Sequence, residues 1–180
     1  INNAGIVVGK YFHKHTAEEI EKTMMINANA PMHVTTNFLS EMIKRNTGHI
    51  CNISSSASLL SNPKMSVYAA SKWSVFSWSD SLRIEMKQLK KDIKVTTILP
   101  YYINTGMFDG VKSRIPILDA EKTALTIIKA IEKNKKIITI PWWIYRFTRF
   151  GQTVMSVNLL EWFAGTLMGI YKTMDDFKGR

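Results

Sequence analysis

Tyr68-Ala69-Ala70-Ser71-Lys72 lies in a segment of helical composition, after the apolar run His49-Ile50-Cys51-Asn52-Ile53 and the serines Ser54-Ser55-Ser56. A tyrosine and a lysine four residues apart on a helix share one face, so we expect the Lys72 ammonium near the Tyr68 phenol. A nearby cation favours the phenolate and lowers the pKa of the phenol. The pair therefore predicts a tyrosine that exchanges protons in catalysis.

Helical and strand-like segments alternate on both sides of this pair. We predict helices over residues 16–26, 30–44, 67–90 and 122–133, and strands over residues 49–54, 93–99 and 136–140. Thr16 and Glu19 have the spacing of a capping box, and residues 1–5 have the pattern of a strand end that runs into a turn. Alternation of this kind is typical of a parallel sheet with crossover helices, so the predicted fold class is α/β.

Composition limits the partners and the chemistry. The 24 Lys plus Arg against 14 Asp plus Glu give a net charge of +10, which suits nucleic acid, an anionic membrane or an anionic cofactor. No basic run carries interleaved aromatics, so we predict no nucleic acid partner. Cys51 is the single cysteine, and we expect a buried thiol without an internal disulfide, which favours a reducing compartment. The four histidines lack ligand spacing, so no metal is predicted.

Taken together, the motifs resemble the short-chain dehydrogenase/reductase family. The resemblance runs from residue 1 to about residue 141, and the motifs follow the family's order: Asn2-Asn3-Ala4-Gly5, Asn27, Ser55, Tyr68, Lys72, and then Pro100 to Thr105. The family usually places its serine thirteen residues before the tyrosine, which selects Ser55 and leaves Ser54 and Ser56 as fallback choices. The resemblance implies the C-terminal portion of a Rossmann-like, doubly wound parallel sheet in residues 1–141, followed by a helical extension.

The resemblance also implies an oxidoreductase that uses NAD or NADP. Tyr68 would exchange a proton with the substrate oxygen, Ser55 would hydrogen-bond that oxygen, and Lys72 would lower the pKa of Tyr68 and bind the nicotinamide ribose. Asn27 is expected to hold a water that links Lys72 to solvent. The cofactor-binding residues implied are Asn3, Ala4, Gly5, Tyr68, Lys72, Pro100, Ile103 and Thr105.

Two features depart from the family's pattern. Tyr101 follows Pro100, where the family usually has glycine, so we expect an altered nicotinamide end or substrate mouth. The family's glycine-rich turn, which receives the pyrophosphate, and the residue that separates NAD from NADP would both precede Ile1. We therefore expect the first part of the fold to be missing and this polypeptide alone to bind cofactor poorly.

Residues 142–180 form a second region, rich in aromatic and apolar side chains. Arg146, Arg149 and Glu161 interrupt its apolar runs before they reach the ~20 residues of a membrane span. Two interpretations stay open, an interfacial helix at an anionic membrane surface and a substrate lid or dimer contact. The membrane-associated retinol dehydrogenase branch, with related hydroxysteroid dehydrogenases, is the part of the family that the chain resembles most, through residues 103–108, 114–116 and 174–180.

Single residues also have ordinary structural interpretations. Tyr68 and Lys72 alone would be a solvated helix pair, serines commonly satisfy loop backbone, and Asn27 alone would cap a helix. Their order in combination favours catalysis.

Two functions remain in view. The first is an oxidoreductase acting on a lipophilic alcohol or carbonyl, retinoid or steroid-like, for which we expect a homodimer at the endoplasmic reticulum membrane or lipid droplet surface, with a cytoplasmic location as the alternative. The second is a catalytically inactive truncated chain that acts as a dimer partner through helices 30–44 and 67–90.

Overall fold

A parallel sheet forms the centre of the computed structural model, which describes residues 1–179; Arg180 lies outside them. Its strands β1 (Gly48–Ile53), β2 (Ile93–Pro100) and β3 (Ile137–Ile140) lie in the order β1-β2-β3. The register pairs Ile50 with Val95 and Ile98 with Ile138. On the other edge of β1, the Asn2 N–H donates to the Cys51 carbonyl at 2.8 Å, so the first residues run beside this strand.

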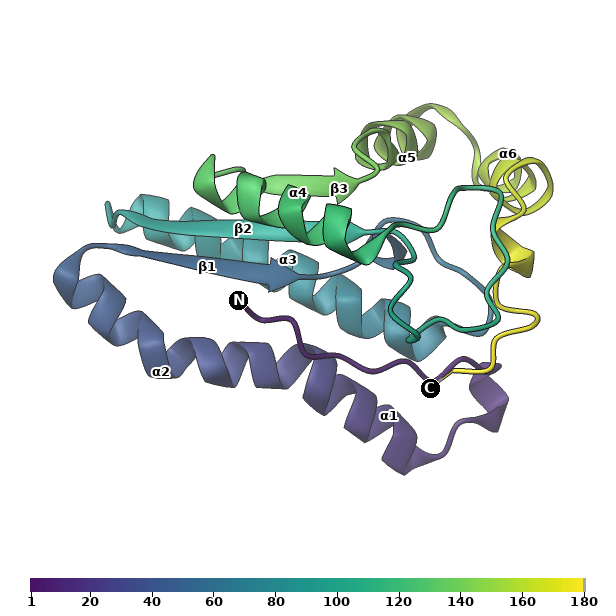
Figure 1. Cartoon of the computed structure of the whole chain (residues 1–180), viewed down its shortest axis with the longest axis horizontal. Helices are drawn as coiled ribbons and strands as arrows, with labels where there is room; N and C mark the ends of the chain where they lie inside the picture. The colour runs from purple at the N-terminus through teal and green to yellow at the C-terminus, as the bar shows by residue number, and fades with distance from the viewer. Residues whose placement is uncertain (180) are drawn as a thin grey trace.

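Helices cover both faces of the sheet (Figure 1). On one face, α2 (Ala30–Arg45) and α3 (Ser66–Gln88) pack against apolar side chains of β1 and β2. On the other face, α4 (Ala120–Glu132) packs against Cys51 and Ile98. Successive strand residues point to opposite faces, so each strand contributes to both layers. Helices on both faces of a parallel sheet confirm the predicted doubly wound α/β class.

One long helical rod replaces the two separate helices predicted over residues 16–26 and 30–44. The rod consists of α1 (Ala17–Met24), a π-helical turn (Met25–Asn29) and α2, without a break between them. The prediction of an interruption near residue 26 is therefore wrong, because the chain changes its hydrogen-bond pattern there instead of ending a helix. The capping box between Thr16 and Glu19 is confirmed, and so is the end of the rod, where Asn46 adopts a left-handed conformation.

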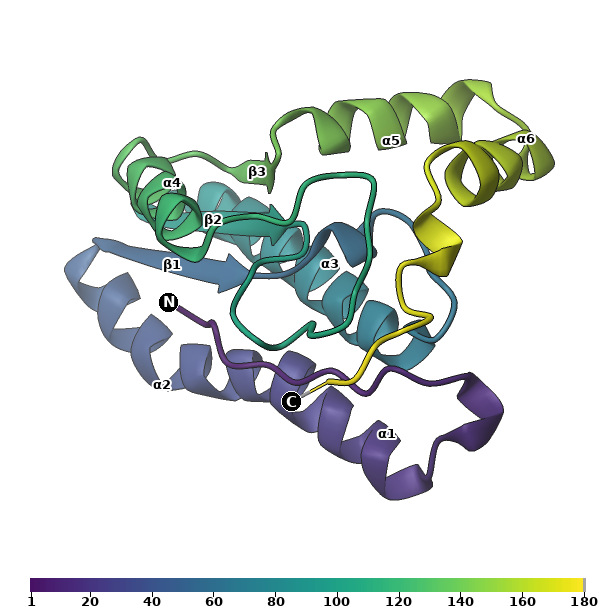
Figure 2. The same cartoon turned by 45° about the vertical axis from the view of Figure 1, so that its right-hand side comes forward.

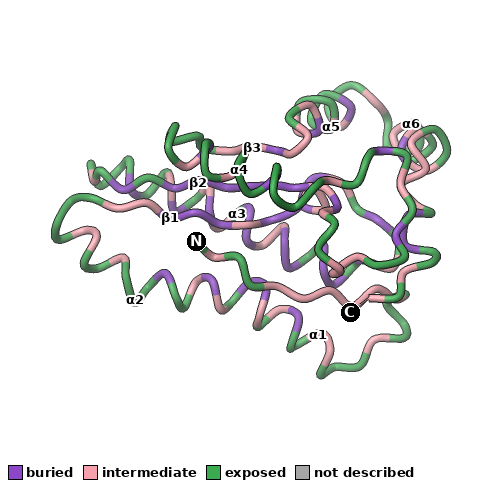
Figure 3. The backbone as a smooth tube through the Cα atoms, viewed as in Figure 1, coloured by how far each residue is buried: buried purple, intermediate pink, exposed green. Residues whose placement is uncertain are grey.

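The other predicted elements occur within a few residues of their expected bounds. Short 3-10 turns are added at Phe12–Lys14 and Ser56–Ser58. Figure 3 shows burial concentrated along β1, β2 and the inner face of α3.

The last region is helical, with α5 (Trp143–Val154), α6 (Val157–Trp162), a π-helical turn (Phe163–Leu167) and a 3-10 turn (Ile170–Lys172). These elements lie beyond the carboxyl ends of the strands, and the chain then returns along the N-terminal segment (Figures 1 and 2). Ile144 of α5 packs into a core cluster with Leu59, Phe76 and Leu99. Within residues 1–179, we find no helix with the length and hydropathy needed to cross a membrane.

Candidate functional site

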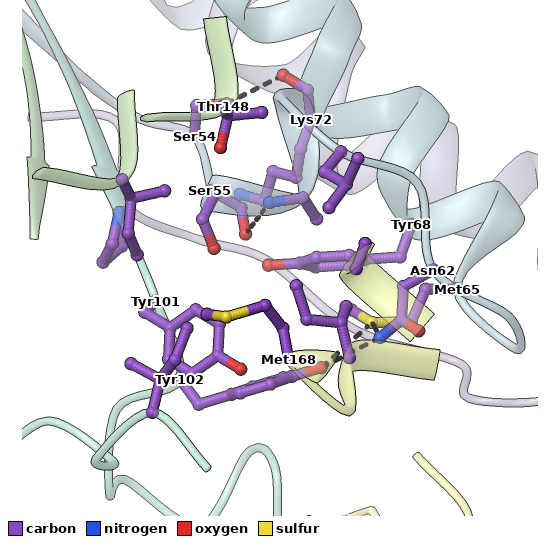
Figure 4. Close-up of a pocket in the computed structure, with 18 of the residues that line it drawn as sticks. Ser54, Ser55, Asn62, Met65, Tyr68, Lys72, Tyr101, Tyr102, Thr148 and Met168 are labelled. Carbon is purple, nitrogen blue, oxygen red and sulfur yellow. Dashed lines mark hydrogen bonds between the residues drawn. The ribbon is translucent and has the colours of Figure 1, made fainter. Parts of the chain in front are cut away.

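A cavity of about 540 Å³ lies at the carboxyl ends of the strands. This is the edge where open α/β sheets bind ligands. Ser55, Tyr68 and Lys72 all line it, brought together from the end of β1 and the first two turns of α3. In Figure 4 the hydroxyl of Tyr68 points toward Ser55, while Tyr101 and Tyr102 lie across the cavity.

Tyr68 is buried in the cavity wall. Burial raises its pKa to about 12, while the Ser55 hydroxyl acts in the opposite direction. The Lys72 Nζ lies 5.9 Å from the centroid of the Tyr68 ring, so the four-residue spacing does bring the two side chains together. Loss of solvent around the phenol has the largest effect, so the net pKa of Tyr68 is raised. A lowering of this pKa by Lys72 stays a prediction.

Lys72 is itself almost completely buried, with 4% of its surface exposed. Its Nζ donates to the Ile53 carbonyl at 3.0 Å, at the carboxyl end of β1. Burial lowers the pKa of Lys72 to about 8 because the ammonium has lost most of its water. The lysine therefore changes its charge close to physiological pH.

The two buried serines at the end of β1 have different surroundings. The Ser54 hydroxyl donates to the Lys72 carbonyl at 2.8 Å and is committed to the backbone of α3. The Ser55 hydroxyl accepts from the Ala57 N–H at 3.1 Å, which leaves its proton for another acceptor. Ser55 also influences the pKa of Tyr68. This geometry favours Ser55 over Ser54 as the serine that acts with Tyr68.

Asn27 lies in the π-helical turn and is buried behind the cavity wall. Its Oδ1 accepts from the Ile6 N–H at 2.8 Å, and its Nδ2 donates to the Ile6 carbonyl at 2.9 Å. Nδ2 also reaches Ser71 Oγ at 3.0 Å, next to Lys72 on α3. Asn27 thus joins the N-terminal segment to α3, and the helix-cap interpretation does not apply.

Seven of the eight residues implied for cofactor binding line the cavity. They are Asn3, Gly5, Tyr68, Lys72, Pro100, Ile103 and Thr105. Ala4 is exposed and does not line it. At Gly5 a Cβ would lie 3.3 Å from Asn27 Oδ1 and 3.4 Å from Lys72 Nζ, so a side chain would crowd this polar corner. Gly5, Lys72 and the loop after β2 could therefore hold a ligand that approaches the backbone closely.

The remainder of the cavity is apolar. Its wall is built by α5, α6, the π-helical turn after α6, and the loops before α3 and after β2. The apolar residues include Leu60, Ile115, Ile144, Leu160, Phe163 and Met168. Tyr101 narrows this end, with its hydroxyl 2.8 Å from Ser113 Oγ and its ring edge-on to Tyr102 at 4.6 Å between centroids. Burial raises the pKa of Tyr101 to about 12, so it is a neutral wall residue at physiological pH.

Three polar residues near Tyr68 had no signal of their own in the sequence: Asn62, Tyr102 and Thr173. Tyr102 lies inside the segment from Pro100 to Thr105. The resemblance implied cofactor binding for Pro100, Ile103 and Thr105 but gave no role to Tyr102 itself. Across residues 1–179, no group of three or more histidine, cysteine, aspartate and glutamate side chains has the arrangement of a metal site.

A family model described as short chain dehydrogenase matches residues 1–115. Retinol dehydrogenase 10-B of Danio rerio is 36% identical over 167 residues, covering 89% of this chain and 49% of the relative. Epidermal retinol dehydrogenase 2 of Mus musculus is 34% identical over 185 residues, covering 100% of this chain and 59% of the relative. The chain spans about half the length of the curated relatives it matches.

Solved structures with the same fold include a short-chain dehydrogenase/reductase from Burkholderia phymatum in complex with NAD. It aligns with a TM-score of 0.73 and 21% identity, over 84% of this chain and 64% of that chain. A short-chain dehydrogenase from Sphingobium yanoikuyae in complex with NADPH aligns with a TM-score of 0.71 and 23% identity. The alignment covers 86% of this chain and 64% of that chain. The sheet, the order of the motifs and the matched family model agree, and this chain belongs to the short-chain dehydrogenase family.

Proposed function

We propose that this chain carries the catalytic residues of an NAD(P)-dependent oxidoreductase that interconverts a lipophilic alcohol and its carbonyl compound. The observation that supports this most is a single cavity with Ser55, Tyr68 and Lys72 in its polar part and apolar side chains over the rest. A lipophilic substrate would bury its hydrocarbon in the apolar part and present its oxygen to the polar residues.

Tyr68 is the proposed general acid and base. A neutral phenol, favoured by burial, donates its proton to the carbonyl oxygen during reduction and recovers it from the alcohol during oxidation. Ser55 donates a hydrogen bond to the same oxygen and so fixes its distance from the phenol. When its side chain is charged, Lys72 stabilises the phenolate that Tyr68 forms during reduction. Asn27, buried behind the cavity wall, would hold the water that links Lys72 to solvent.

The residues at the polar corner fit a nicotinamide dinucleotide. Gly5 allows close approach of a ligand to the backbone, and Lys72 donates one hydrogen bond within residues 1–179, to Ile53, which leaves its other N–H groups for a ribose hydroxyl. Asn3, Pro100, Ile103 and Thr105 complete this end. The cofactor, when bound, would supply or accept the hydride. The two related structures described above contain NAD and NADPH, and both remain candidates.

A retinoid or steroid-like alcohol is the proposed substrate class. Retinol dehydrogenases are among the relatives that match 82% or more of this chain, and the apolar part of the cavity suits a long or fused-ring hydrocarbon. α2 and α3 are the proposed surface of a homodimer.

A membrane surface is the proposed partner of α5 and α6. Phe147 and Phe150 line the cavity although 68% and 65% of their surfaces are exposed, so the cavity reaches the surface beside them. Trp142 and Val157 are exposed on the same helical region, and Arg146 is exposed between the aromatics. Apolar residues with interspersed arginines suit an anionic lipid interface. The protein would then act at the endoplasmic reticulum membrane or a lipid droplet, and a lid with a cytoplasmic location is the alternative.

Vesicle flotation distinguishes a membrane interface from a substrate lid as the role of α5 and α6. The complete protein is mixed with vesicles of neutral lipid or with added anionic lipid, beside Trp142→Glu and Val157→Glu. Binding that needs anionic lipid and is lost in both variants supports the interface, whereas a protein that stays unbound with both kinds of vesicle supports the lid.

Hydride transfer tests the catalytic proposal. The protein expressed from its complete coding sequence is given all-trans-retinol with NAD or NADP, and retinal with NADH or NADPH, while nicotinamide absorbance is followed. We expect Tyr68→Phe to reduce turnover by about 10² to 10⁴-fold. Tyr171→Phe is the matched control, because Tyr171 lies outside the cavity lining. Full activity in Tyr68→Phe would refute the proposed role, and a protein without cofactor binding would favour the inactive dimer partner.

A further inference from the structure

Three buried polar side chains from distant parts of the chain meet beside Tyr68. Asn62 Nδ2 donates to the Tyr102 hydroxyl at 3.2 Å and to Thr173 Oγ1 at 3.0 Å. The Tyr102 and Thr173 hydroxyls are themselves 3.0 Å apart. Figure 4 shows Asn62 joined to Tyr102 beneath the Tyr68 ring. Loss of any of these bonds would leave a desolvated polar group, so each bond favours the observed arrangement.

Tyr102 links this network to the catalytic tyrosine. It belongs to the same core cluster as Tyr68, together with Met65, Val111 and Met174. Phe108 packs edge-on against both tyrosine rings, at 5.8 Å from Tyr68 and 4.9 Å from Tyr102 between centroids. A shift of Tyr102 would therefore be transmitted to the phenol of Tyr68.

Thr173 belongs to a C-terminal strap, which we define as residues 169–178. The strap runs along the N-terminal segment and the loop after β2 (Figures 1 and 2). Its backbone is held by a bond from the Lys112 N–H to the Thr173 carbonyl at 3.2 Å and by one from the Lys178 N–H to the Asp109 carbonyl at 2.9 Å. Met174 is 1% exposed and fills the cluster around Tyr68.

The outer contacts of the strap are ion pairs at the surface. Lys64 meets Asp175 at 2.9 Å, and Lys112 meets Asp176 at 2.6 Å, with both aspartates more than half exposed. Exposed pairs of this kind stabilise little, typically ~0–1 kcal/mol each. The buried hydroxyls, the backbone hydrogen bonds and the buried Met174 side chain therefore contribute more to the position of the strap than the charges do.

We propose that Tyr102 and Thr173, joined through Asn62, are positioning residues that latch the C-terminal strap against the cavity wall and thereby fix the Tyr68 ring for proton transfer. This inference rests on the proposed function. Removal of the latch would let the strap separate and admit water beside Tyr68. Because burial is what raises the pKa of Tyr68, its pKa would then fall toward its ordinary value.

Two variants of Thr173 separate the hydroxyl from the shape of the side chain. Thr173→Val keeps the volume and loses the hydroxyl, whereas Thr173→Ser keeps the hydroxyl. In the complete protein, with retinol and NAD or NADP, we expect Thr173→Val and Tyr102→Phe to lower kcat by on the order of 10- to 100-fold with a smaller change in KM. We also expect their pH profiles to move to lower pH. Thr173→Ser should restore both properties, and Lys112→Gln should leave them unchanged.

Hydrogen exchange gives a readout that does not depend on turnover. Backbone amides of the strap should exchange faster in Thr173→Val than in Thr173→Ser, and the double variant Thr173→Val/Tyr102→Phe should behave like the single variants because both remove the same latch. Equal exchange in Thr173→Val and the unsubstituted protein would overturn the latch. An unchanged pH profile in an active Thr173→Val protein would overturn its positioning role. Failure of the proposed function is distinguished by full activity in Tyr68→Phe.

Discussion

The Nζ of Lys72 lies 5.9 Å from the centre of the Tyr68 ring, and burial moves the pKa values of the two groups in opposite directions. The pKa of Lys72 falls to about 8, and that of Tyr68 rises to about 12. In both residues burial shifts the equilibrium toward the neutral form, because neither charge is well solvated. Burial therefore disfavours a permanent ion pair between Lys72 and a Tyr68 phenolate.

Lys72→Met removes the cost of a buried ammonium. The pKa of Lys72 is about 8 in the folded chain and 10.5 ordinarily, so the unfolded chain binds more protons between these values and stability rises with pH across that window. We expect Lys72→Met to be more stable than the unsubstituted chain at pH 7, by roughly 3 kcal/mol, and the difference to vanish above about pH 10. Urea unfolding at pH 7, 8.5 and 10 measures this difference in unfolding free energy. Lys87→Met is the control, because the Lys87 side chain is exposed. A difference that is constant with pH would contradict this account.

Asn27→Asp replaces two buried donors with acceptors while keeping the side-chain shape. The new carboxylate would face the Ile6 carbonyl and the Ser71 hydroxyl, where Nδ2 now donates. We expect a loss of unfolding free energy of about 2 kcal/mol or more at neutral pH. Burial would raise the pKa of the introduced acid, so part of the stability should return as the pH falls through that value.

The matched control for Asn27→Asp is Asn37→Asp. Asn37 donates from Nδ2 to the His33 carbonyl at 3.1 Å on the exposed side of α2. Chemical denaturation of both variants at pH 5 and pH 7.5 compares the same substitution in two settings. Equal losses of unfolding free energy in the two variants would show that the buried hydrogen bonds of Asn27 stabilise the fold no more than the exposed one of Asn37.

Cys51 should resist thiol reagents while the chain is folded. It is 2% exposed, and burial raises its pKa to about 11. At pH 8 we expect labelling to be roughly 100-fold or more slower than for an exposed cysteine, and to become fast in denaturant. A Ser77→Cys variant, with its cysteine on the exposed face of α3, provides the comparison in the same chain. Rapid labelling of Cys51 in native buffer would mean that β1 opens readily.

Gly110→Ala should displace the strap. Gly110 has φ +87°, and a Cβ there would lie 2.0 Å from the Asp176 carbonyl oxygen. Backbone strain alone costs about 1–3 kcal/mol, and the clash with backbone adds to it. Limited proteolysis should cut the strap faster in this variant than in Gly151→Ala, where the nearest atom to the new Cβ is Leu160 Cδ1 at 3.3 Å, outside the strap. Equal resistance of Gly110→Ala and the unsubstituted chain would refute this prediction.

Much of the fold and the central site could be predicted from local patterns. The capping box of Thr16 and Glu19, the strands and the start of α3 depend on neighbours in the sequence, which a single sequence displays. Ser55, Tyr68 and Lys72 were recognisable because their spacings are fixed by one strand, one loop and one helix. The cavity brings these three together as expected.

Properties that depend on distant packing could not be predicted. The pKa of Tyr68 is dominated by its burial in the cluster that includes Tyr102 and Phe108, which the lysine four residues away does not reveal. The proposed role of Thr173 depends on contacts with Tyr102 and Asn62, which precede it by 71 and 111 residues in the sequence. No spacing in the sequence marks such contacts.

The π-helical turn at Met25–Asn29 sets the relative rotation of the two halves of the long rod. α1 contacts α3, α2 contacts β1, and the turn between them presents Asn27 to Ile6. Each residue advances an α-helix by about 100°, so the turn, which spaces its hydrogen bonds one residue further apart, decides which face each half presents. Deleting one residue between positions 25 and 29 would turn α1 away from α3, even though every side chain of α1 remained unchanged.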